Sequence, residues 1–154
     1  MVYIRIKKIK GNSYAYLVEN KNTSNGPRQK VKKYLGRVHY LEEKKQNHEI
    51  KDTGKLNLLS KLVLKELQNY GFTKKGSNYV LKNLSFNPLK NTLTKKTKSN
   101  SKKEAIISLN EGFLCTFSLQ RLSSFKKTKD FNKDAYTLAK YFLEAGLPVS
   151  ENDF

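Results

Sequence analysis

The chain has 154 residues, of which 31 are Lys or Arg and 13 are Asp or Glu, so its formal net charge at pH 7 is +18. Repulsion among so many like charges opposes compaction, and a globular enzyme has no physical use for it. The charge therefore favours a protein with a polyanionic partner, above all nucleic acid. A single cysteine excludes an internal disulfide and favours a reducing, cytoplasmic setting. The apolar runs are too short to span a bilayer, so we expect no membrane segment.

The positive charge is concentrated in two segments of the chain. Residues 1–40 hold ten basic residues and one acid, Glu19, and residues 71–103 hold nine lysines and no acid. Only four of the basic residues are arginines, and lysine ammonium groups suit phosphates better than base edges. A basic surface that serves only solubility is the alternative, but two nearly acid-free segments exceed what solubility requires.

The first forty residues predict three strands. Apolar residues alternate with basic residues and a tyrosine over 2–9, and over 13–20 the two faces alternate between Tyr14, Tyr16 and Val18 on one side and Ala15 and Leu17 on the other. A turn at Gly11-Asn12 separates these segments, and a third strand runs from 28 to about 38. An antiparallel meander of these strands has one aliphatic face: Ile4, Ile6, Leu17, Val31 and Leu35. Its opposite face sets tyrosines among basic residues: Tyr3, Arg5, Lys7, Tyr14, Tyr16, Arg28, Lys30, Lys32 and Tyr34. This second face is predicted either to bind a ligand or to pack on the rest of the protein.

Residues 41–54 are polar and predict a linker or a short exposed helix. Apolar residues then recur at helical spacing over 55–70, and Gly71 is well placed to end this helix with Phe72 packed behind it. Residues 79–86 predict one strand. Residues 91–103 contain a single apolar residue, Leu93, so we expect a mobile basic loop near 90–103.

The remaining segment predicts a strand and two helices. The strand covers 105–109 and a helix covers 113–125. A final helix begins after Asp130 or Asn132, presents one apolar stripe and ends at Gly146 and Pro148. Its predicted stripe is Ala135, Leu138, Ala139, Phe142 and Leu143.

Together these elements predict an α+β protein. An N-terminal three-stranded antiparallel sheet (1–40) is followed by a polar linker (41–54) and a body (55–154) of about three helices with short strands and the basic loop.

Two stretches resemble known families. YAYLVEN at 14–20 and GPRQKVKKYLGRV at 26–38 resemble a segment near the N-terminus of some DDE-type insertion-sequence transposases, in which an aromatic-rich LVE strand precedes an RQ strand that ends in LG. The matching residues are Tyr14, Tyr16, Leu17, Val18, Glu19, Arg28, Gln29, Leu35 and Gly36. Since 154 residues leave no room for the acidic catalytic core of such enzymes, the resemblance implies a module that contacts nucleic acid without strand-transfer chemistry. Through NEGFLC at 110–115 and AYTLAKYFLEAGLP at 135–148, the chain also looks like the small basic conserved archaeal proteins of unassigned function.

The sequence offers little for catalysis, so we expect no catalytic residue, metal or cofactor. Two histidines, His39 and His48, and the single Cys115 do not make a zinc site. Cys115 lies among Phe113, Leu114 and Phe117, which indicates a small buried hydrophobe rather than a nucleophile. The carboxylates cluster in the linker and near the C-terminus and do not predict a two-metal nuclease.

The sequence therefore predicts a non-catalytic nucleic-acid-binding protein, with a slight preference for double-stranded DNA. The alternatives are an RNA- or ribosome-associated protein, and a regulatory module that uses the helices of 104–154 to bind a protein partner. The candidate contact residues are Arg5, Lys7, Tyr14, Tyr16, Arg28, Lys30, Lys32, Tyr34, Arg37, Lys95, Lys96, Lys98, Lys102 and Lys103.

Overall fold

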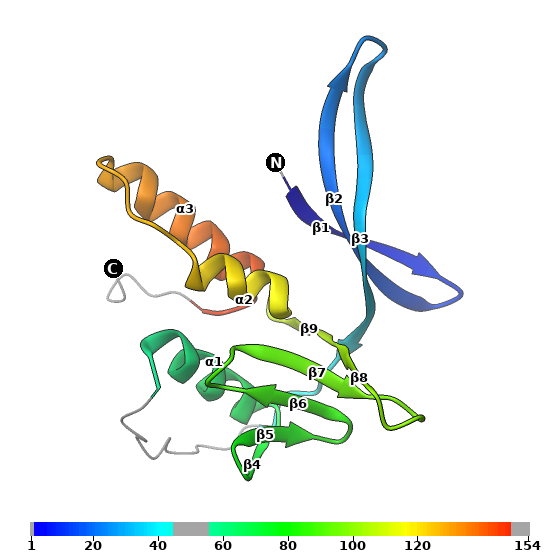
Figure 1. Cartoon of the computed structure of the whole chain (residues 1–154), viewed down its shortest axis with the longest axis vertical. Helices are drawn as coiled ribbons and strands as arrows, with labels where there is room; N and C mark the ends of the chain where they lie inside the picture. The colour runs from blue at the N-terminus through cyan, green and yellow to red at the C-terminus, as the bar shows by residue number, and fades with distance from the viewer. Residues whose placement is uncertain (1, 45–55, 149–154) are drawn as a thin grey trace.

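The structure, a computed structural model, describes residues 2–44 and 56–148. These residues form three helices and two five-stranded sheets (Figure 1). The strand order is β1-β2-β3-β9-β10 in the first sheet and β4-β5-β6-β7-β8 in the second. The predicted α+β class with about three helices is confirmed. In the described part of the chain, no helix has both the length and the apolar character needed to cross a bilayer.

The N-terminal sheet is mixed, and the prediction of a purely antiparallel three-stranded sheet is wrong in this respect. β1 (Val2–Ile9), β2 (Asn12–Thr23) and β3 (Gly26–Tyr40) pair antiparallel as predicted. The far end of β3 then pairs in parallel with β9 (Ile106–Leu109), which pairs in turn with β10 (Gly112–Leu114). Val38 and Ile106 lie opposite each other and are both buried, so burial of this apolar pair accompanies the unexpected parallel contact.

The second sheet is an antiparallel meander whose inner face shares a core with a helix. Its strands are β4 (Thr73–Lys75), β5 (Asn78–Leu81), β6 (Leu84–Asn87), β7 (Thr92–Lys96) and β8 (Lys102–Glu104). Phe86 and Leu93 are register partners, and both belong to the same core as Val63, Leu64 and Leu67 of α1 (Leu58–Asn69).

Two predictions for this region are wrong. Residues 79–86 form two strands, because the chain turns at Lys82, which has a positive φ of 54°. Residues 90–103 are not a mobile loop, since they contain β7 and β8. A strand with one buried face needs apolar side chains only at alternate positions, and here the fully buried Leu93 suffices while the sheet partners satisfy the backbone.

The ends of α1 follow the sequence signals. The Asn57 side chain accepts a hydrogen bond from the Ser60 N–H (2.9 Å) at the N-terminus. At the C-terminus Gly71 has φ +97°, and the N–H groups of Gly71 and Phe72 donate to the carbonyls of Gln68 and Leu67. Phe72 is buried as predicted. Most of the predicted linker lies outside the described residues, but Leu41 packs against the larger core.

Of the last two helices, the first begins later than predicted and the second buries only part of its predicted stripe. α2 (Thr116–Ser123) starts three residues later than predicted, because 112–114 pair with β9. α3 (Phe131–Glu144) has Asp130 as its N-cap, as predicted. The predicted stripe is only partly used: Leu138 and Phe142 pack against the core, whereas Leu143 is 55% exposed.

Candidate nucleic-acid interface

Tyrosines and basic side chains gather on one face of β1, β2 and β3. Two rows cross the strands in register, Arg5–Tyr16–Tyr34 and Lys7–Tyr14–Arg37. The ring centroids of Tyr16 and Tyr34 lie 5.1 Å apart, and the Lys7 Nζ lies 5.3 Å from the centroid of the Tyr16 ring. We call this surface the tyrosine face: Tyr3, Arg5, Lys7, Tyr14, Tyr16, Tyr34 and Arg37.

The opposite, aliphatic face of these strands is the one that packs on the rest of the protein. Ala15 and Leu35 share a core with Val38, Ile106 and Cys115. Partly buried residues of the first strands and of the α2 region pack around it: Ile4, Ile6, Leu17, Phe113 and Phe117. Because this face covers α2, the tyrosine face points away from it, and Tyr34 is 52% exposed. Partial desolvation, reinforced by the neighbouring Tyr16 and Tyr14, raises the pKa of Tyr34, so its phenol is neutral at physiological pH.

Two irregularities in β3 decide which basic residues join the tyrosine face. The register skips one β3 residue between the partners of Ala15 and Tyr16, and another between the partners of Leu17 and Val18. The first skip places Arg37 beside Tyr34, although simple alternation separates them. The second skip corrects our prediction that Arg28 and Lys30 share the tyrosine face.

After the second skip, Lys30 pairs with Glu19 and Arg28 with Lys21, on the side of the ribbon opposite the tyrosines. Val31, predicted for the aliphatic face, pairs instead with Val18 on the tyrosine side and is 50% exposed. Lys32 is engaged within the protein, since its Nζ lies 2.9 Å from a carboxylate oxygen of Glu19. The hydrogen bond from Lys32 lowers the pKa of Glu19.

The two basic segments meet at a cleft beside β3. Its volume is about 410 Å³, and its lining comes from β3, β7 and β8: Tyr34, Leu35, Gly36, Arg37, Lys95, Lys103 and Glu104. Lys95 and Lys103 lie directly opposite each other in the second sheet, an arrangement of like charges that costs stability unless an anion lies between them. The one acid, Glu104, is itself paired with Lys33 (3.1 Å). We call this the basic cleft.

The basic cleft includes only some of the predicted lysines. Lys95 and Lys103 line it, but Lys96 and Lys102 alternate to the other face of the second sheet, and Lys98 lies in the exposed β7–β8 connection. Sequence reasoning missed Lys33 and Glu104. The sequence signal was that simple alternation places Lys33 between Val31 and Leu35 on the predicted aliphatic face, where a lysine does not fit, and its partner Glu104 lies in a distant strand.

His39 is a half-buried histidine next to this region. Within the described residues its Nε2 is buried without a hydrogen-bond partner. Burial lowers the pKa of His39, and the nearby Lys95 and Arg37 lower it further, so the ring is neutral at neutral pH.

This environment predicts a loss of stability on mild acidification. Because the folded pKa lies below the ordinary value of 6.5, the unfolded chain takes up the proton first. The contribution of His39 is therefore complete above that value and is lost as the pH falls through it towards the folded pKa. Urea unfolding at about pH 7.5 and about pH 5 should show a larger decrease for the parent than for His39→Gln. An equal decrease in both proteins would contradict this assignment.

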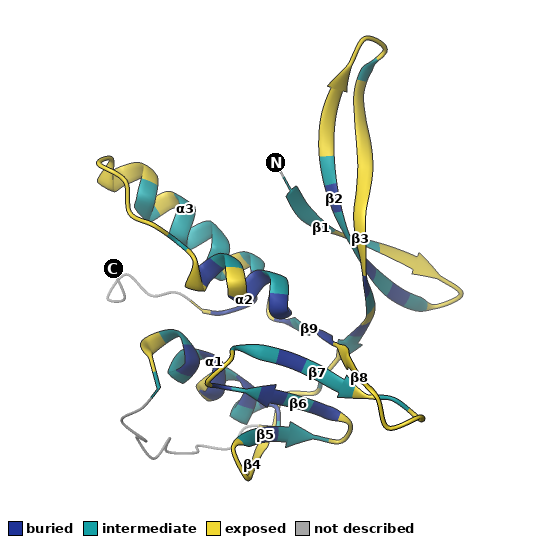
Figure 2. Cartoon of the chain, in the orientation of Figure 1, coloured by how far each residue is buried: buried dark blue, intermediate teal, exposed yellow. Residues whose placement is uncertain are grey.

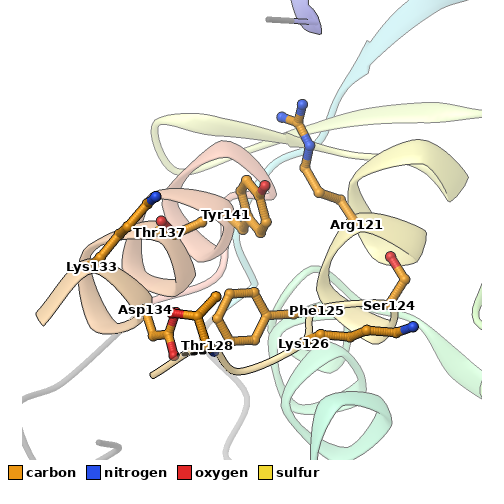
Figure 3. A pocket seen from close by; sticks show the side chains of 9 residues that line it. All are labelled: Arg121, Ser124, Phe125, Lys126, Thr128, Lys133, Asp134, Thr137 and Tyr141. Atoms are coloured by element: carbon orange, nitrogen blue, oxygen red, sulfur yellow. Dashed lines mark hydrogen bonds between the residues drawn. The ribbon is translucent and has the colours of Figure 1, made fainter. Parts of the chain in front are cut away.

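A second concavity, of about 310 Å³, lies between α2 and α3 (Figure 3). One of its lining cations, Arg121, is already engaged: Nη1 donates to Glu144 (2.7 Å) and Nη2 donates to the Val2 carbonyl (2.7 Å). The guanidinium also lies within 5 Å of the Phe117 and Tyr141 ring centroids. Arg121 therefore ties β1 to both helices, and we assign it a structural role.

Among the described residues, no group of three or more His, Cys, Asp or Glu side chains is placed to hold a metal ion. Cys115 is buried as the sequence indicates, and burial raises the pKa of its thiol.

The chain matches no known protein-family model, no curated protein and no solved structure. The resemblances of residues 14–38 and of the C-terminal stretches therefore stay sequence-based predictions, and functional inference depends on the site itself.

Proposed function

We propose that this protein binds nucleic acid through its phosphate backbone, without catalysis, and that double-stranded DNA is its preferred form. The observation that carries the proposal is the basic cleft, where Arg37 of one acid-poor segment and Lys95 and Lys103 of the other line a single concavity. Nothing in the core requires these like charges to be adjacent, and a phosphate chain would neutralise them.

The tyrosine face complements the basic cleft, because Tyr34 belongs to both. Lysines act as point charges towards phosphates, whereas Arg37 offers a planar fork that can bind a phosphate through two hydrogen bonds. Exposed tyrosine edges and rings next to such cations supply contacts to sugars or unpaired bases. The combination supports binding that follows the polymer and depends little on its sequence.

The salt dependence of binding tests this function. If about five cations engage phosphates, the logarithm of the affinity for a labelled duplex should fall with the logarithm of salt at a slope near roughly −4. Fluorescence anisotropy titrations at several salt concentrations measure this slope. A slope shallower than about −1, or retention on heparin without binding to DNA or RNA, would refute the proposal.

One observation favours a second candidate, a protein partner on α3. No residue of this helix is fully buried, and its exposed surface includes Phe131 (77%), Tyr136 (75%) and Leu143 (55%). Exposed apolar residues at this density are typical of interaction surfaces. Replacing Tyr136 and Leu143 by Ser separates the two functions, because these residues lie outside the basic cleft and nucleic-acid binding should be unchanged.

A further inference from the structure

The β2–β3 hairpin extends beyond the first sheet as a free two-stranded ribbon. Among the residues that the structure describes, the pairing of β1 ends at Val2 and Glu19, but β2 and β3 stay paired from Asn20–Gln29 to Thr23–Gly26. Figure 1 shows this ribbon projecting away from the body, and in Figure 2 most of it is coloured as exposed. We call residues 20–29 the arm. An isolated two-stranded ribbon is marginally stable in water, so a projecting one needs local support or a partner.

Side chains at the base of the arm supply local support. The Tyr3 hydroxyl donates to Asn20 Oδ1 (3.3 Å), Gln29 donates to the Tyr3 hydroxyl, and Arg5 donates to Gln29. This network joins both arm strands to β1. It fixes the direction in which the arm leaves the sheet.

The chemistry of the arm points to a polyanion. It contains two cations, Lys21 and Arg28, and no acid, while Lys30 and Lys32 lie at its base on β3, next to Glu19 of β2. Lys21 and Arg28 are direct cross-strand partners, and like charges in that position oppose pairing. Arg28 and Lys30 make no ion pair or side-chain hydrogen bond with the residues that the structure describes. Pro27 and the lysines also disfavour the addition of another strand to the arm, which argues against a protein partner that binds by strand pairing.

The dimensions of the arm favour B-form DNA over duplex RNA. Four residue pairs at about 3.3 Å each extend the arm by about 13 Å, more than the roughly 8.5 Å depth of the major groove of DNA. That groove is about 12 Å wide and admits a two-stranded ribbon, whereas the major groove of A-form RNA is deep and too narrow for side chains to read.

We infer that the arm inserts into the major groove of double-stranded DNA, with Arg28 and Lys30 contacting the groove while the basic cleft holds the adjacent backbone. This inference rests on the proposed function, and it adds the groove of the DNA that is contacted and the element of the protein that enters it. Arg28 is the residue best suited to a guanine edge, because its fork matches the two acceptors there.

The test uses a duplex whose major groove is filled but whose phosphates are unchanged. Cytosines that carry a glucosylated 5-hydroxymethyl group provide this. The parent protein should bind the modified duplex about tenfold more weakly than the unmodified one, because the groove is blocked. In a short-arm variant, an Asn-Gly turn replaces residues 21–28, so that Asn20 and Gln29 close the ribbon. This variant should bind both duplexes equally.

The controls separate failure of the arm from failure of the function. Lys8→Gln/Lys10→Gln removes two charges at the β1–β2 end and should retain the parent's discrimination between the duplexes. Circular dichroism and thermal unfolding check that the short-arm variant folds. Arg28→Gln/Lys30→Gln in the full arm, which keeps the backbone intact, should reduce the discrimination as well. If the parent binds both DNA duplexes equally, the arm inference is wrong while the proposed function stands. If it prefers duplex RNA, the arm inference and the preference for DNA are both wrong while binding through the phosphate backbone stands; if no nucleic acid is bound, both proposals fail.

Discussion

Replacing Arg37, Lys95 and Lys103 together by Gln should weaken binding to duplex DNA by on the order of a hundredfold at about 0.1 M salt. These three cations line the basic cleft from three strands, so their loss removes the point where the two basic segments meet. Three phosphate contacts account for about 2.7 units of the salt slope, which should become shallower by up to that amount. Anisotropy titrations of parent and variant across salt concentrations measure both quantities.

The matched control removes the same charge elsewhere. Lys126, Lys127 and Lys129 are exposed on the connection between α2 and α3, which lies far from β8 (Figure 1). Replacing all three by Gln lowers the net charge equally but leaves the basic cleft intact. If this control weakens binding as much as the cleft variant does, net charge rather than the cleft accounts for affinity.

Leu93→Ala should destabilise the protein by about 2–5 kcal/mol. Leu93 is fully buried opposite Phe86 and belongs to the core under α1. The truncation loses burial and leaves a cavity beneath β7, the strand that carries Lys95. Urea unfolding followed by circular dichroism measures the change in the free energy of unfolding.

Leu89→Ala is the control, because Leu89 lies four residues away and is 67% exposed. Its replacement should change stability by no more than about 0.5 kcal/mol. Equal and small effects of the two substitutions would mean that residues 90–103 behave as the mobile loop that composition alone predicts.

Local signals were sufficient wherever a structure depends on neighbouring residues. The alternation over 2–9 and 13–20 predicted β1 and β2, and the Asp130 cap with Gly146 predicted α3. Gly71 and Phe72 marked the end of α1 because a left-handed residue followed by an apolar contact is a local requirement of helix ends. Composition, by contrast, wrongly predicted a mobile loop at 90–103. There the burial of one leucine and the pairing of β7 with β8 outweigh the polar character of the sequence.

The sequence by itself determined the charge, its division into two acid-poor segments, and a face on which tyrosines alternate with cations. Tertiary structure alone decided where those groups lie. Two one-residue skips in β3 bring Arg37 to the tyrosine face and turn Arg28 and Lys30 away from it, because each extra residue reverses the alternation of a strand. The parallel pairing of β3 with β9 and the Lys33–Glu104 ion pair involve residues far apart in the chain. Lys95 and Lys103 lie beside Arg37 only because strand pairing and core packing join distant parts of the chain. The periodicity of a single segment cannot predict this arrangement.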